Sequence, residues 1–359
     1  MANRIIRPLL QACIVIRNRR GERALDPHGD DEFRNPGISI RTQFRRIFVS
    51  GRFDLVGLTI VLLALGGLFS SLTPYFLTFP NLKALGVAVS LNAILAAAQT
   101  VVIISGMIDL SFTSILALCG IAAQKLQLMG MPFPIIVLGA IAVGVGCGLV
   151  NAAISVWGGV NPLIATIGTG LAFRGVAFIW LDLYSMPYFS DTTLNLLGNG
   201  SFLGFPAPMI ISGAVIAAIW ILMRFTRFGS RVYVMGGSEA AARLAGVSVS
   251  RLKVQVLVLS GVAAAIGGLL LTSLNGTAFP DAARGDELIV IAAVILGGTA
   301  LMGGRGSVVG TLLAVLILGM MANGMNLLGI NAFWQVFLSG VILLAAVVID
   351  EQRNRARQR

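Results

Sequence analysis

From residue 55 onward, long apolar runs alternate with short polar segments. Each run is about 20 residues long, the length that a helix needs to cross roughly 30 Å of hydrocarbon. The pattern predicts an all-α polytopic membrane protein with about ten transmembrane helices, some of them broken. We expect the spans near residues 54–73, 83–105, 111–128, 134–157, 163–183, 207–224, 253–275, 287–301, 307–325 and 332–349.

One junction between these runs is unusual. Residues 82–123 contain only Lys83 and Asp109 as charged residues, so they are too long for one span and leave almost no loop between two. We expect a break at residues 105–111, close to or within membrane depth. Non-helical backbone is tolerated there only where protein or a water-filled cavity covers it, and broken helices often face a transport path. Alternatively, Asp109 or Ser111 simply caps the next helix.

A second junction, residues 296–306, is rich in glycine. A nucleotide-binding loop needs Gly-Lys-Ser/Thr after a strand, and none of the chain's lysines, Lys83, Lys125 and Lys253, follows a glycine. The sequence therefore predicts no nucleotide site. The glycines instead favour a tight reversal and close packing of spans, as does the Ala140-Gly144-Gly148 spacing in an earlier run.

Composition agrees with a membrane protein. The chain is 57% hydrophobic and 11% charged, with a mean hydropathy of +0.90, whereas soluble domains carry about 25% charged residues. The net charge of +11 (26 basic minus 15 acidic residues) does not indicate nucleic acid, because the basic residues cluster at segment ends and in tails. The single histidine, His28, excludes a histidine-built metal site and a Ser-His-Asp triad. Three scattered cysteines predict no disulfide framework.

Charge also predicts the orientation. Residues 1–52 form a basic arm with eleven arginines, and apolar residues at helical spacing near its end predict an interfacial helix. The segment 224–253 and the tail 351–359 are basic too. With ten spans in the transmembrane domain 53–350, all three basic segments fall on the cytoplasmic side, and the loop 184–206, which lacks Lys and Arg, falls outside.

The polar segment 224–253 contains a well-delimited short helix. Ser238 can cap its first turn, Glu239 suits its positive end, and Gly246 can close its far end. Arg243 lies four residues after Glu239 and can pair with it. A chain that only joins two spans needs fewer residues, so we interpret this helix as a docking site. An interfacial helix that merely links the spans is the alternative.

Polar side chains within the apolar runs are the other candidates for function. Most are neutral hydrogen-bonding groups, which suit an uncharged polyol or sugar better than an ion. Each of them can instead join helices, at about 0.6 kcal/mol per hydrogen bond. The candidates for a substrate path are Asn92, Gln99, Asp109, Ser111, Thr166, Thr169, Arg174, Asn323 and Asn326.

Four stretches carry a resemblance to a known family. They are SGMIDLSFTS at 105–114, NPLIATIGTGLAFRGVA at 161–177, the polar segment 228–252, and GDELIVIAAVILGGTALMGGRGSVVG at 285–310. Together they resemble motifs in the permease subunits of bacterial ABC importers for monosaccharides, the ribose/xylose/galactose/autoinducer-2 group. The resemblance covers residues from about 55 to 350.

The resemblance implies a set of partners. Such permeases pair as homo- or heterodimers in the bacterial inner membrane, two ATPase subunits grip their cytoplasmic loops, and a periplasmic sugar-binding protein delivers the substrate. Mg-ATP is then handled by the partner ATPase, and this chain carries no cofactor. The residues that the resemblance assigns to the ATPase-coupling helix are Gly236, Gly237, Ser238, Glu239, Ala240, Ala241, Arg243, Leu244 and Gly246.

Two other function classes remain open. An ion-coupled secondary transporter usually needs intramembrane carboxylates. Here Asp109 is the only acid deep in a predicted span, whereas Asp182, Asp286 and Glu287 lie at span ends. An integral-membrane enzyme would need convergent catalytic groups, which this sequence does not indicate.

Overall fold

The computed structural model describes residues 52–181, 193–331, 333–338, 340–342, 344 and 348, which belong to one unit, Phe48–Arg359. The predicted basic arm with its interfacial helix and the tail 351–359 lie outside the described residues. The same is true of the first part of the loop 184–206 and of much of the span predicted at 332–349.

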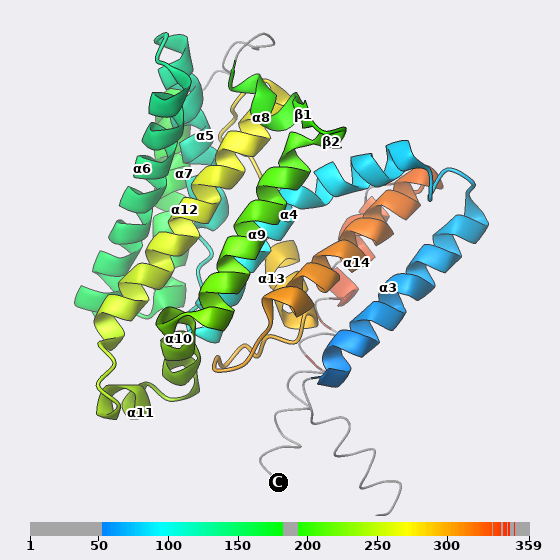
Figure 1. Cartoon of the computed structure of the whole chain (residues 1–359). Coiled ribbons are helices and arrows are strands. Elements are labelled where there is room, and N and C mark those ends of the chain that lie inside the picture. Colours follow the sequence, from blue (N-terminus) through cyan, green and yellow to red (C-terminus); the bar gives the residue numbers. More distant parts are fainter. Residues whose placement is uncertain are drawn as a thin grey trace, which may run out of the picture. The chain divides into compact units, whose positions relative to one another are not determined.

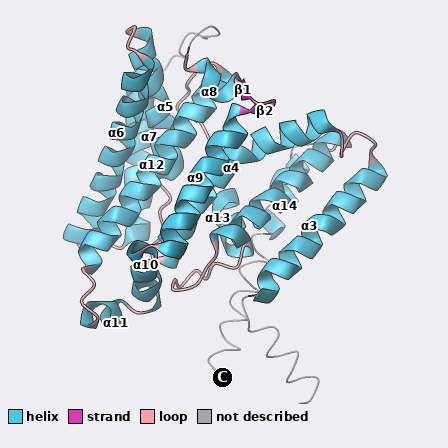
Figure 2. Ribbon diagram, viewed as in Figure 1, coloured by secondary structure: helices cyan, strands magenta, loops and turns pink. Residues whose placement is uncertain are grey.

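The described chain is almost entirely helical (Figure 2). Its elements in chain order are α3 (Arg52–Leu72), α4 (Phe79–Ile104), α5 (Phe112–Leu128), α6 (Phe133–Ala152), the π-helix η1 (Ala153–Trp157), α7 (Pro162–Leu181), α8 (Asn195–Asn199), β1 (Ser201–Phe202), β2 (Phe205–Pro206), α9 (Ala207–Phe225), α10 (Arg227–Gly237), α11 (Glu239–Leu244), α12 (Val249–Asn275), α13 (Asp286–Leu296) and α14 (Val308–Leu327).

The predicted class of an all-α polytopic membrane protein is confirmed. Among the described residues, seven helices are long and apolar enough to cross a membrane: α3, α4, α6 with η1, α7, α9, α12 and α14. Helix α5, with 17 residues, is a shorter apolar helix, and another begins at Phe333.

Helix α13 is shorter than the span predicted at 287–301. Its 11 residues rise about 16 Å, roughly half the thickness of the hydrocarbon layer. It ends because Gly298 adopts a positive φ of 88°, and the Thr299 N–H donates back to the Val294 carbonyl at 3.2 Å. The apolar residues after it form a loop rather than a further helical turn, so α13 is too short to cross the hydrocarbon layer.

The break predicted at 105–111 is confirmed. Gly106, with φ at 82°, ends α4, and the Met107 N–H donates to the Val102 carbonyl at 3.2 Å. The backbone stays non-helical until Phe112. Met107, Asp109 and Ser111 are buried, so protein rather than lipid covers most of this irregular stretch.

Helix α12 forms the centre of the packing and contacts α4, α5 and α6 (Figure 1). Its contact with α6 is made at the predicted small residues, because a Cβ added at Gly144 would lie 2.4 Å from the Gly261 carbonyl oxygen and one added at Gly148 would lie 2.7 Å from that of Leu257. Its contact with α5 is equally close, since a Cβ at Gly268 would lie 2.3 Å from the Leu116 carbonyl oxygen. Backbone therefore meets backbone at both interfaces.

The loop predicted at 184–206 contains local structure that the pattern did not indicate. Helix α8 precedes an antiparallel hairpin in which β1 pairs with β2. Leu203 and Gly204 both have positive φ, as a two-residue hairpin turn of type I′ requires. The hairpin lies at the end of the bundle opposite α10 and α11 (Figure 1).

Candidate functional site

Helices α10 and α11 lie at the end of the bundle where α3 begins (Figure 1). We call Arg227–Gly246, which contains the helix predicted as a docking site, the docking segment. The predicted cap of α11 is confirmed, because the Ser238 hydroxyl accepts a hydrogen bond from the Ala241 N–H at 3.2 Å. Gly246 has a φ of 76° and closes the far end, where the Val247 N–H donates to the Ala242 carbonyl at 3.0 Å. The sequence therefore encodes both ends of this short helix locally.

Glu239 makes two charged contacts at the start of α11. Arg243 donates to one carboxylate oxygen at 2.7 Å, as predicted, and Lys253 of α12 donates to the other at 2.8 Å. The hydrogen bonds from Arg243 and from Lys253 lower the pKa of Glu239 below its ordinary value. The Lys253 contact, which local spacing could not predict, fixes α11 against the first turns of α12.

The outer face of α11 is apolar and exposed. Ala242 is fully buried and holds the helix to the bundle, whereas Ala240 and Ala241 are not buried and Leu244 is 91% exposed. A rigidly capped helix that presents a leucine away from its own bundle provides a small surface on which a partner can dock.

A buried polar network surrounds the break after α4. Asp109 accepts three hydrogen bonds: from the Ser111 N–H at 2.8 Å, from the Ser111 hydroxyl at 2.6 Å, and from the Ser260 hydroxyl of α12 at 2.7 Å. Three donors satisfy a carboxylate that would otherwise be costly to bury. Ser111 occupies the N-cap position of α5, but neither its side chain nor that of Asp109 accepts a hydrogen bond from the first turn of that helix; Asp109 instead holds the Ser111 N–H just before the helix begins.

The Asp109 network extends to three further helices. The Gln99 side chain of α4 donates to Ser260 at 2.9 Å, and Asn151 of α6 donates to the Ser111 hydroxyl at 2.7 Å. The Thr169 hydroxyl of α7 donates to the side-chain amide oxygen (Oδ1) of Asn151 at 2.5 Å. The full set is Gln99, Asp109, Ser111, Asn151, Thr166, Thr169 and Ser260, where Thr166 accepts from the Leu110 N–H at 3.2 Å.

Five of the nine residues predicted for a substrate path therefore lie in one network. Asn151 and Ser260 are the members that sequence reasoning does not identify. Asn151 carries the same signal as the others, a lone polar residue in an apolar run, whereas Ser260 is flanked by small and apolar residues that give no sign of its role. Each member is at most 7% exposed, so the network is closed to water in this conformation.

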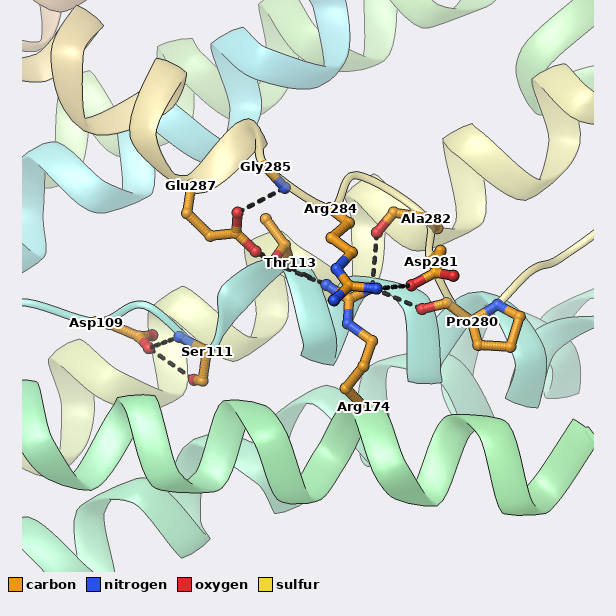
Figure 3. A network of polar contacts seen from close by, with 10 residues as sticks. All are labelled: Asp109, Ser111, Thr113, Arg174, Pro280, Asp281, Ala282, Arg284, Gly285 and Glu287. Atoms are coloured by element: carbon orange, nitrogen blue, oxygen red, sulfur yellow. Dashed lines mark hydrogen bonds and ion pairs between the residues drawn. The ribbon is translucent and has the colours of Figure 1, made fainter. Parts of the chain in front are cut away.

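A second cluster surrounds Arg174 of α7 (Figure 3). Its guanidinium donates to the carbonyls of Pro280 at 2.6 Å and Ala282 at 2.9 Å and to the Thr113 hydroxyl at 3.1 Å. It also lies 3.7 Å from a carboxylate oxygen of Glu287, which accepts from Thr113. Two hydrogen bonds from the Arg174 guanidinium thus hold the loop between α12 and α13, and its other contacts reach Thr113 and Glu287.

The Arg174 cluster joins the starts of two short helices. Thr113 lies in the first turn of α5 and Glu287 in the first turn of α13 (Figure 3). The hydropathy pattern places Glu287 at the end of a span, and its side chain, at the start of the short helix α13, is only 21% exposed. Short and broken helices in a membrane bundle commonly line transport paths.

The remaining candidates lie apart from both clusters. Asn323 of α14 and Asn81 of α4 exchange amide hydrogen bonds at 3.0 and 2.9 Å, an arrangement that joins two helices. Asn326 is exposed and accepts from Gln335 at 2.6 Å. Among the described residues, the buried amide oxygen of Asn92 has no hydrogen-bond partner.

Comparison with known proteins gives one family and a set of relatives. The family model for "Branched-chain amino acid transport system / permease component" matches residues 81–347. The chain is 39% identical over 322 residues to the ribose import permease protein RbsC of Escherichia coli (strain K12), covering 88% of this chain and 98% of that protein. It is 37% identical to the L-arabinose transport system permease protein AraH of the same strain (87% and 95% covered) and 34% identical to its D-allose transport system permease protein AlsC (83% and 92% covered).

Proposed function

The chain belongs to the family of permease components of branched-chain amino acid transport systems, and on this premise we propose that it forms the path for a monosaccharide through the bacterial inner membrane. It is a multi-pass permease subunit of an ABC sugar importer and not an enzyme. The relatives named for ribose, allose and arabinose support a monosaccharide as its substrate. The family gives no support to an ion-coupled transporter or an integral-membrane enzyme.

Importers of this kind work with an ATPase and a substrate-binding protein. For this chain we propose two ATPase subunits that hold Mg-ATP, a second permease chain, and a periplasmic sugar-binding protein. The ATPase contact is the docking segment, through the coupling residues Gly237 to Gly246, whereas the coupling residue Gly236 faces the Ile104 carbonyl at the end of α4. The observation that carries this proposal is the capped, outward-facing helix α11, with Leu244 exposed and Glu239 held between two cations.

The substrate path, in this proposal, opens where the Asp109 network and the Arg174 cluster now close the bundle. The Asp109 network is built mainly from hydroxyl and amide groups, which can exchange hydrogen bonds with the hydroxyls of a sugar. The Arg174 cluster offers the guanidinium, the Glu287 carboxylate and the Thr113 hydroxyl for the same purpose. Asn92 and Gln99 of α4 each have a buried amide oxygen without a partner among the described residues, so both retain capacity to accept a hydrogen bond. Asn323 and Asn326 receive less support, because one joins α14 to α4 and the other is exposed.

Co-purification tests the docking proposal. The chain is expressed with its partner ATPase and purified in mild detergent, as the natural sequence and as the double variant Glu239→Lys with Leu244→Trp. We expect a stoichiometric ATPase with the natural chain and its loss with the variant, while the elution volume of the permease stays unchanged. Phe202→Trp, a bulky change on the hairpin at the opposite end, is the control and retains the ATPase. Normal ATPase binding and sugar uptake by the double variant would refute the docking role.

A further inference from the structure

Three backbone segments meet where the docking segment contacts the rest of the bundle. They are the end of α10 at Gly236, the end of α4 at Ile104 and Gly106, and the loop between α13 and α14 at Gly303 and Gly304. The Gly304 N–H donates to the Ile104 carbonyl at 2.8 Å, which joins the loop to α4. We call Gly106, Gly236, Gly303 and Gly304 the glycine junction.

Three of the four positions in the glycine junction, Gly236, Gly303 and Gly304, have no room for a side chain. A Cβ added at Gly236 would lie 1.7 Å from the Ile104 carbonyl oxygen and 2.6 Å from the Gly304 nitrogen. A Cβ at Gly303 would lie 2.8 Å from the Gly106 Cα, and Gly303 has a φ of 83° that only glycine adopts readily. The Tyr233 hydroxyl of α10 adds a hydrogen bond to the Gly306 carbonyl at 3.0 Å, so α10 contacts this loop at two points.

Contacts of this kind transmit displacement. Where side chains lie between two elements, changes of rotamer absorb part of a small shift, but backbone atoms in van der Waals contact have no such freedom. A movement of α10 therefore displaces residues 104–106 directly. Gly106 begins the non-helical stretch that leads, three residues later, to Asp109 and its network.

We propose that the glycine junction is the route by which movement of the docking segment reaches the Asp109 network, with Gly236 as the positioning residue. The inference rests on the proposed function, because it requires an ATPase that moves α11. It adds a specific mechanical contact between the docking segment and the broken helix α4. Glu239, Arg243 and Leu244 serve the binding of the ATPase, whereas Gly236 serves the transfer of its movement to α4.

The test is the ratio of sugar transported to ATP hydrolysed, measured in proteoliposomes with the complete transporter and its binding protein. Gly236→Ala is compared with Gly213→Ala, in α9. Gly213 is also helical, and a Cβ there meets nothing within 4 Å. Both variants gain the same helix propensity. We expect Gly236→Ala to retain the ATPase and its hydrolysis while the ratio falls about tenfold, and Gly213→Ala to match the natural chain.

A ratio for Gly236→Ala equal to that of the natural chain would overturn the inference. If Gly236→Ala does not assemble with the ATPase, the same ratio is measured for Tyr233→Phe. This variant removes only the hydrogen bond to the Gly306 carbonyl and introduces no clash. Its ratio is expected to fall about twofold to fivefold, and an unchanged ratio overturns the inference. A failure of the proposed function gives a different result: the natural chain itself would not co-purify with an ATPase. The inference, which rests on the proposed function, would then fail as well.

Discussion

At the scale of single residues, the Asp109 network shows what a sequence can and cannot indicate. The Asp109–Ser111 contact spans two residues and could be anticipated from local spacing. The Asn151–Ser111 and Ser260–Asp109 contacts join residues 40 and 151 positions apart. Such partners are fixed by how α6 and α12 pack, so no local pattern contains them. The set of polar candidates was therefore informative, but their grouping required the fold.

Ser260 provides a test of how the buried carboxylate is held. Ser260→Ala removes one of the three donors to Asp109 and also the partner of the Gln99 amide. We expect a loss of stability of about 1–3 kcal/mol, because buried polar groups lose their partners. The thermal unfolding midpoint in detergent should fall relative to the natural chain. Ser250→Ala, at an exposed position of the same helix, should leave the midpoint unchanged. Equal midpoints for the two variants would contradict this account.

Substitution of Arg174 distinguishes a role of this residue in transport from a role in folding. Arg174→Lys keeps the positive charge, but a single ammonium cannot reproduce the planar arrangement of donors that reaches Pro280, Ala282 and Thr113. If the cluster lines the path, uptake falls at least about tenfold while the amount of folded permease in the membrane is maintained. The same comparison applies to Asp109→Ala. A fall in uptake that only parallels a fall in folded protein would assign both residues to helix packing.

At the scale of elements, the predicted spans agree with the observed helices where the sequence marks the helix ends. Gly246 was recognised as a helix end, and the break at 105–111 was predicted because residues 82–123 are too long for one span; Gly106 and Gly246 both adopt positive φ. The end of α13 was missed because Gly297 and Gly298 precede further apolar residues, which hydropathy alone assigns to the span. Residues 299–306 are instead held by contacts with Ile104 and Tyr233, which lie far away in the sequence.

The attachment of α11 to α12 should depend on pH through Glu239. Its pKa is lowered in the folded chain, so its pairs with Arg243 and Lys253 stabilise α11 above the ordinary carboxyl pKa. That contribution is lost as the pH falls from the ordinary value through the lowered one. Amide exchange within α11, measured by mass spectrometry, should therefore become faster relative to α10 on acidification.

Glu239→Gln is the control for this pH dependence. The variant lacks the charge, so its α11 should exchange faster than that of the natural chain at pH 7, and the difference should vanish in acid. A difference that persists at the lowest pH would show that the Glu239 pairs are not its cause.

At the scale of the whole molecule, the expected ten-span arrangement makes a prediction about sidedness. The docking segment and the start of α3 lie at one end of the bundle, and the hairpin lies at the other (Figure 1). The positive-inside rule assigns the first end to the cytoplasm. Leu244→Cys should therefore react with a membrane-impermeant thiol reagent only in inverted vesicles, and Phe202→Cys only in intact spheroplasts. Reaction of Leu244→Cys from outside would reverse the orientation and remove the ATPase proposal.

The contact of α12 with α5 and α6 has a consequence for how such a subunit can change shape. Helices whose backbones touch through Gly144, Gly148 and Gly268 cannot slide past one another without first separating. We therefore expect these three helices to move as one rigid unit during a transport cycle. Relative motion is then expected at interfaces where side chains lie between helices, such as that of α4 with α14. Access would alternate between the two sides as such helices move against the rigid unit of α5, α6 and α12.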